Sequence, residues 1–150
     1  MNPHFRDMLS ALSAEDAEFM VVGAYALAAH GIPRATGDID IWIRPNKENS
    51  QRVWRALKRF GAPVSRLAAE DLTVAEVVFQ IGVAPQRIDL LTSIDGVDFE
   101  EAWPNRKQAE VEGLRFAVLG RGDMLRNKKA TGRPKDLADV AWLESEQDAS

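Results

Sequence analysis

The chain has 150 residues, of which 45% are hydrophobic and 28% are charged. This size and composition predict one domain spanning residues 1–150. Nineteen Lys and Arg against 23 Asp and Glu give a formal net charge of −4, which argues against a protein that coats nucleic acid through overall positive charge. With no cysteine and only two histidines, the chain has no thiolate zinc site or disulfide scaffold, and a metal site must use mainly carboxylates, which suits Mg²⁺.

No apolar run approaches the roughly 20 residues that span a bilayer, and residues 1–10 contain no hydrophobic signal segment. The sequence therefore predicts no membrane contact and a cytoplasmic location.

The first half of the chain alternates between helical and extended patterns. Apolar residues at helical spacing predict helices, and short β-branched runs that stop at glycine or proline predict strands. The expected elements are a helix over 5–12, a strand over 19–22 that stops at Gly23, a helix over 24–29, a strand over 38–43, and a helix from Asn46 to Gly61.

The strand over 38–43 carries the first candidate chemistry. Its strict alternation places the three isoleucines on one face and Asp38, Asp40 and Trp42 on the other, so the two carboxylates share a face. Two adjacent carboxylates repel each other and usually need a cation nearby. A solvent-facing edge strand gives the same alternation, so this pattern alone does not decide between the two interpretations.

The second half of the chain predicts a sheet extension followed by helices. The expected elements are antiparallel strands over 76–81 and 87–91, a helical turn within 97–103, a hairpin of 109–112 with 114–119, and helices over 123–131 and from about Lys135. Asp89 lies inside an apolar run, where a fully solvated carboxylate is out of place.

Asp89 completes a possible triad with Asp38 and Asp40 if its strand neighbours theirs. Three converging carboxylates can hold two divalent ions that bridge a nucleoside triphosphate and lower the pKa of an attacking hydroxyl. In this arrangement Asp89 is placed to accept the hydroxyl proton.

These motifs resemble a known superfamily. The segments VVGA (21–24), TGDIDI (36–41) and IDL (88–90) are similar to the signature of the polymerase-beta-like nucleotidyltransferases. The segment 127–140 resembles the small bacterial nucleotidyltransferases grouped with the AbiEii toxins, and the similarity extends from about residue 19 to 143. The resemblance implies an α/β (α+β) fold with a small mixed, mostly antiparallel sheet and flanking helices.

The resemblance also implies roles for individual residues. Gly23 and Ala24 lie at a strand-to-helix junction that approaches the triphosphate, although relatives carry Gly or Ser where this chain has Ala24. Ala24 offers no hydroxyl, which implies weaker nucleotide binding. Thr36 lies on the approach loop, and Lys128 and Arg133 are the expected phosphate contacts.

The C-terminal helices, over about 121–147, are expected to close the nucleotide site. Asp136 and Asp139 are one helical turn apart. They either belong to the active site or anchor Lys128 and Arg133, and we favour anchoring.

The implied reaction transfers a nucleoside monophosphate from an NTP to a hydroxyl, with two Mg²⁺ ions. The acceptor stays open between a tRNA or a partner protein in a toxin–antitoxin setting and a small molecule such as an aminoglycoside or lincosamide antibiotic. A catalytically weak nucleotide-binding module is a further alternative. The small size is compatible with a homodimer.

Overall fold

The short apolar runs form a single sheet. The computed structural model describes residues 1–32, 37–83 and 86–149. Within them the strands are β1 (Phe19–Val22), β2 (Ile39–Ile43), β3 (Val78–Ile81), β4 (Ile88–Leu91), β5 (Lys107–Val111) and β6 (Leu114–Val118).

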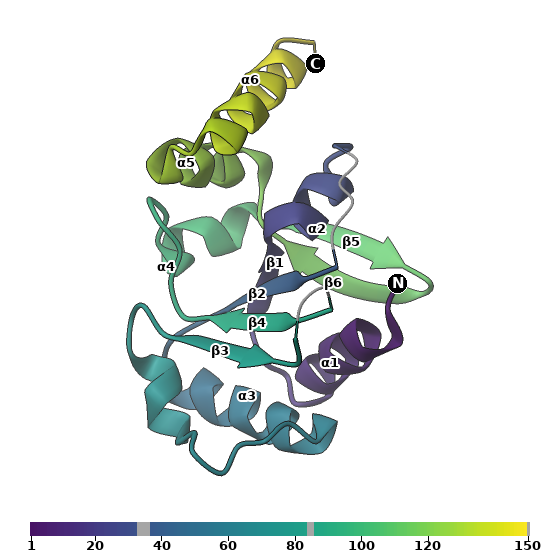
Figure 1. The fold of residues 1–150 in the computed structure, drawn as a ribbon, viewed down its shortest axis with the longest axis vertical. Coiled ribbons are helices and arrows are strands. Elements are labelled where there is room, and N and C mark those ends of the chain that lie inside the picture. The colour runs from purple at the N-terminus through teal and green to yellow at the C-terminus, as the bar shows by residue number, and fades with distance from the viewer. Residues whose placement is uncertain (33–36, 84–85, 150) are drawn as a thin grey trace.

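The strand order in the sheet is β3-β4-β2-β1-β6-β5, with β3 and β5 at the two ends (Figure 1). The pairs β2 with β4 and β1 with β6 are parallel, and the other three neighbouring pairs are antiparallel. The predicted mixed, mostly antiparallel sheet is therefore confirmed, as are the antiparallel pairing of β3 with β4 and the β5–β6 hairpin.

Helices flank this sheet in the predicted order (Figure 1). They are α1 (Pro3–Ala14), α2 (Gly23–Ala29), α3 (Lys47–Phe60), α4 (Phe99–Ala102), α5 (Arg121–Thr131) and α6 (Pro134–Ala149), with 3₁₀ turns η1 (Ala69–Thr73) and η2 (Trp103–Asn105). The Asn46 side chain caps α3 by accepting a 2.8 Å hydrogen bond from the Asn49 N–H, and Gly61 ends that helix with φ 93°.

Several predicted boundaries differ from the observed ones by a residue or two, and two of them have local explanations. The strand expected from residue 76 begins at Val78, because Glu76 has φ 64° and a left-handed residue interrupts an extended strand. The last helix begins at Pro134, next to the predicted start near Lys135, since proline fits the first turn of a helix, where no intrahelical N–H bond is needed.

The two faces of the sheet differ in what covers them. The isoleucines of β2 lie in one core with the inner residues of α1 and α3, which include Leu9, Leu12, Val53 and Leu57. On the opposite face Trp42 is only 1% exposed and packs edge-on against Phe99 of α4, with ring centroids 5.0 Å apart. Trp42 is therefore a core residue, and Asp38 and Asp40 keep the rest of that face polar.

No helix within the described parts of the chain is long and apolar enough to cross a membrane.

Candidate active site

Three aspartates meet on neighbouring strands. Asp38 directly precedes β2, Asp40 lies within it, and Asp89 lies in β4. The parallel pairing of β2 with β4 places Asp40 opposite Asp89, and paired residues project from the same face of a sheet. The sheet topology thus brings together carboxylates that are 49 positions apart, and it meets the condition under which the sequence predicted a triad.

These aspartates line a cavity of about 480 Å³. Basic side chains from the C-terminal helices line it as well, together with the β1–α2 junction. The lining residues that carry charge or backbone access are Gly23, Ala24, the three aspartates, Arg87, Lys128, Arg133 and Lys135. Every predicted site residue within the described ranges therefore lies in one cavity, whereas Thr36 lies outside the described residues.

Asp40 is the most strongly perturbed of the three carboxyls. Burial, followed by the negative charges of Asp89 and Asp38, raises its pKa from 3.8 to about 6, while Arg87 acts in the opposite direction. A carboxyl with this pKa changes its charge close to neutral pH. Groups with strongly shifted pKa values cluster at functional sites, because binding or catalysis makes use of a charge that burial disfavours.

Arg87 is a site residue that the sequence interpretation missed. Its guanidinium donates to both oxygens of Asp89, from Nε to Oδ1 at 2.7 Å and from Nη2 to Oδ2 at 3.1 Å. It lies 3.7 Å from Asp38 Oδ2, and its backbone N–H donates to Asp38 Oδ1 at 2.9 Å. Period-two alternation could have identified it, since residue 87 shares a strand face with residue 89.

Gly23 allows the chain to turn closely around Asp40. It has φ 69°, and a Cβ at this position would overlap Asp40 Oδ2. Glycine is therefore required both by the backbone conformation and by the neighbouring carboxylate. The adjacent Ala24 lines the same cavity from the first turn of α2.

Two buried aspartates hold the cationic side of the cavity. Lys128 Nζ lies 3.2 Å from Asp136 Oδ1 and 3.4 Å from Asp139 Oδ2, and Arg133 Nε donates to Asp136 Oδ2 at 2.6 Å. Burial would raise the pKa of Asp136, but hydrogen bonds from Arg133, Thr131 and Lys128 outweigh burial and hold that pKa well below its usual range. The predicted anchoring of Lys128 and Arg133 is thus confirmed in the geometry.

Lys135 is a further cation at this cavity. It is exposed and lines the wall beside Arg133. In the sequence, Lys135 stands close to Arg133 at the start of α6, and this proximity indicates that both cations belong to the same site.

The donor set at this site fits a hard divalent cation. Asp38, Asp40 and Asp89 offer only carboxylate oxygens, which Mg²⁺ prefers, and the raised pKa of Asp40 indicates that a cation would relieve repulsion there. Within the described residues, no group of three or more acidic or histidine side chains is already arranged as a metal cage. Arg87 lies between Asp38 and Asp89 and compensates part of their charge instead.

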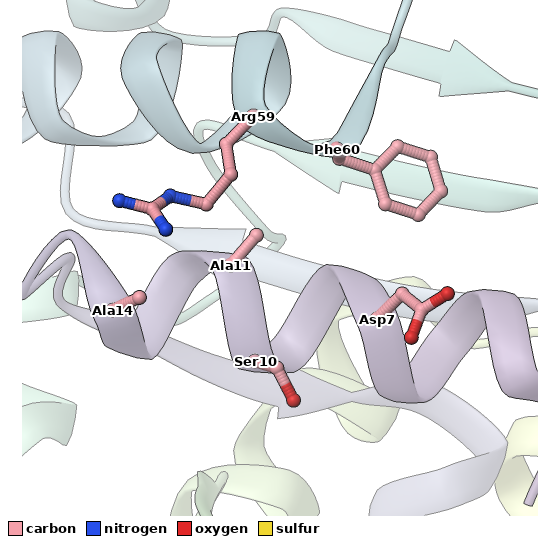
Figure 2. A pocket seen from close by; sticks show the side chains of 6 residues that line it. All are labelled: Asp7, Ser10, Ala11, Ala14, Arg59 and Phe60. Carbon is pink, nitrogen blue, oxygen red and sulfur yellow. The ribbon is translucent and has the colours of Figure 1, made fainter.

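A second hollow of about 340 Å³ lies between α1 and α3 and has different chemistry (Figure 2). Arg59 extends from α3 over Ala11 and Ala14 of α1, and Asp7 is the one carboxylate among its lining residues (Figure 2). Because Arg59 is paired with Glu15 at 3.0 Å, this hollow offers no converging set of reactive groups.

Solved structures of other proteins have folds similar to that of this chain. A candidate nucleotidyltransferase from Thermotoga maritima, TM1012, matches with a TM-score of 0.57 and 17% identity, covering 97% of this chain and 91% of that one. The lincosamide antibiotic adenylyltransferase LnuA, solved with lincomycin bound, matches with a TM-score of 0.60 and 11% identity, covering 97% of each chain. No protein-family profile and no curated protein matches the chain. At these identities the similarity establishes that the chain shares the fold of these two proteins.

Proposed function

We propose that the protein is a Mg²⁺-dependent nucleotidyltransferase that transfers a nucleoside monophosphate from an NTP to a hydroxyl. The observation that carries this proposal is the meeting of Asp38, Asp40 and Asp89 in one cavity that Lys128 and Arg133 also line. A carboxylate cluster facing anchored cations suits a metal-bound triphosphate, because the carboxylates hold the metal and the cations contact the phosphates. Residues 1–150 would form one such domain, with α5 and α6 closing the nucleotide side.

The three aspartates would hold two Mg²⁺ ions. When bound, these ions neutralise phosphate charge and favour ionisation of the attacking hydroxyl. Asp40 would enter the loaded site as a carboxylate, since a neighbouring cation favours its charged form over the protonated form promoted by burial. Gly23 keeps the β1–α2 junction close to Asp40, so the backbone of Gly23 and Ala24 can approach the triphosphate without an intervening side chain.

Asp89 would accept the proton of the attacking hydroxyl. Both of its oxygens accept hydrogen bonds from Arg87, and a turn of the Arg87 guanidinium toward solvent would make Asp89 a stronger base for that step. The Arg87 side chain is 30% exposed, which leaves a direction for this movement.

Lys128 and Arg133 would bind the β- and γ-phosphates. Lys128 is 11% exposed and fixed by two aspartates, whereas Arg133 is 58% exposed and fixed by one. Lys128 therefore supplies a preorganised point charge, and the planar Arg133 fork is freer to follow the phosphate.

We propose two classes of acceptor. A tRNA or a partner protein in a toxin–antitoxin setting follows from the resemblance of residues 127–140 to AbiEii-like proteins. A small-molecule hydroxyl, as in an antibiotic, is supported by the whole-chain similarity to LnuA.

Label transfer tests the function and the acceptor together. The purified protein is incubated with Mg²⁺, each α-labelled NTP and a total bacterial extract or a panel of antibiotics, and RNA, protein and small molecules are then separated. We expect label in one pool with the native protein and none with Asp38→Ala/Asp40→Ala, while the surface variant Glu101→Gln keeps full transfer. Nucleotide binding without labelling of any pool would instead support the weak nucleotide-binding module.

A further inference from the structure

The two ends of the sheet differ in charge. At one end β5 exposes Lys107 and Glu110, and Glu110 lies 3.5 Å from Arg115 of β6. At the other end β3 and its flanks, residues 77–83, contain no charged residue. Charged side chains on an end strand prevent pairing with other chains, so β5 carries this protection and β3 lacks it.

The backbone of β3 has groups that point away from the sheet. Thr92 N–H donates to Val77 C=O at 3.0 Å, which makes residues 77 and 92 a hydrogen-bonded pair of the antiparallel β3–β4 ladder. Because such pairs alternate, Phe79 and Ile81 also bond to β4, whereas the N–H and C=O groups of Val78 and Gln80 face outward. No strand lies beyond β3 in the described part of the chain.

Exposed apolar side chains surround this free edge. Val78 is 52% exposed, and Val74 and Val83, on either side of the strand, are 56% and 80% exposed. Together with Leu137 on α6, these are the exposed large hydrophobic residues of the described chain. Three of the four thus gather at one strand edge, which is typical of an interaction surface.

We propose that β3 is the dimerisation edge and that its occupant is the β3 strand of a second copy of this chain. The two strands would run antiparallel about a two-fold axis at Phe79, so that Val78 of one copy pairs with the partner's Gln80 and the reverse. Both outward-facing residues then use both of their backbone groups, four hydrogen bonds in all. The edge is self-complementary in this register.

The charges at the two ends of β3 also favour a second copy. The exposed Glu76 precedes the strand, and Arg87 lies across from Gly82 at its other end, following the register of β3 with β4. Antiparallel self-pairing brings the Glu76 end of one copy to the Arg87 end of the other, so each Glu76 approaches a guanidinium that also bonds Asp89 within its own copy. The uncharged strand between them adds no repulsion.

The dimer would also extend the surface beside the aspartates. Val78 and Gln80 project from the same face as Asp89, because Gln80 is the register partner of Asp89. In the paired sheet the partner's Val78 follows Gln80 in the row that contains Asp40 and Asp89. The two cavities would therefore open on the same side of one continuous sheet. This inference does not depend on the proposed reaction.

The test is the oligomeric state, measured by sedimentation over a range of concentrations. The native chain should sediment at twice the 16.6 kDa of one copy. Val78→Lys should raise the dimer dissociation constant by at least about 100-fold, because two lysines enter each interface and lose water contacts. Gln80→Pro should act in the same direction, since it removes an outward N–H that β4 does not use. The matched control Leu137→Lys changes a 53% exposed residue away from the edge and should remain dimeric.

Disulfide trapping tests the register. The chain has no cysteine, so Val78→Cys and Gln80→Cys can be made singly and mixed. The mixture should form an interchain disulfide, because hydrogen-bonded partners lie about 5.5 Å apart. Each single variant alone should form far less, because the like positions are about 7–8 Å apart on the diagonal.

A native chain that is monomeric at every concentration, or a dimer that Val78→Lys leaves intact while circular dichroism shows both proteins folded, would overturn the proposal. Neither result would bear on nucleotidyl transfer, which is measured separately.

Discussion

Asp40→Asn should stabilise the folded protein while removing its proposed activity. Burial and the charges of Asp89 and Asp38 raise the pKa of Asp40 from 3.8 to about 6, so the ionised carboxylate destabilises the fold. One pKa unit corresponds to about 1.4 kcal/mol, which gives about 3 kcal/mol for this difference. Because Asp40 keeps some contact with solvent, we expect a gain of about 2–3 kcal/mol in the free energy of unfolding near pH 7.5.

The sign of the pH dependence follows from the same two values. Between about pH 4 and pH 6 the folded protein holds the Asp40 proton more tightly than the unfolded chain, so stability falls as pH rises through this window. The difference in the free energy of unfolding between Asp40→Asn and the native protein should therefore be small below pH 4 and reach its full value above pH 6. Asparagine has no proton to lose, so that contribution to the pH dependence disappears in the variant.

Urea unfolding at several pH values, in metal-free buffer, measures this difference. Glu101→Gln serves as the control, since it removes one negative charge from an exposed side chain and should leave stability unchanged. Mg²⁺ should stabilise the native protein at pH 7.5 more than it stabilises Asp40→Asn. A variant that is less stable than the native protein at pH 7.5, or a gain that does not vary with pH, would refute the electrostatic account of this site.

Three further changes test the surrounding residues. Gly23→Ala should lower the free energy of unfolding by about 2 kcal/mol or more in urea titration and abolish transfer, because its φ of 69° and the Asp40 carboxylate leave no room for Cβ. Asp136→Asn should cost about 3 kcal/mol at pH 7, since it removes one of the two buried carboxylates that hold Lys128 and the one that holds Arg133. Because the Asp136 pKa is lowered, this difference should shrink as pH falls below about 4. Arg87→Gln should move the titration midpoint of Asp40, followed by carboxyl NMR, above about 6, since the charge of Arg87 lowers that pKa. An unchanged midpoint would contradict this electrostatic effect of Arg87.

Local patterns in the sequence determined most of the elements. Alternation in residues 38–43 and apolar spacing in residues 5–12 and 46–60 require only neighbouring residues, so they predict strands and helices directly. The predicted boundary at residue 76 was wrong because the backbone of Glu76 is left-handed, a conformation that its residue type does not announce.

The sequence also indicated which carboxylates belong together, but not what neutralises them. Alternation put Asp38 and Asp40 on one strand face, and the apolar run around Asp89 signalled a buried charge there. The parallel register that sets them opposite each other, and the Arg87 guanidinium that pairs with Asp89, come from strand pairing between distant segments. Strand order and register depend on how the whole sheet buries its faces, so only the tertiary structure decided them.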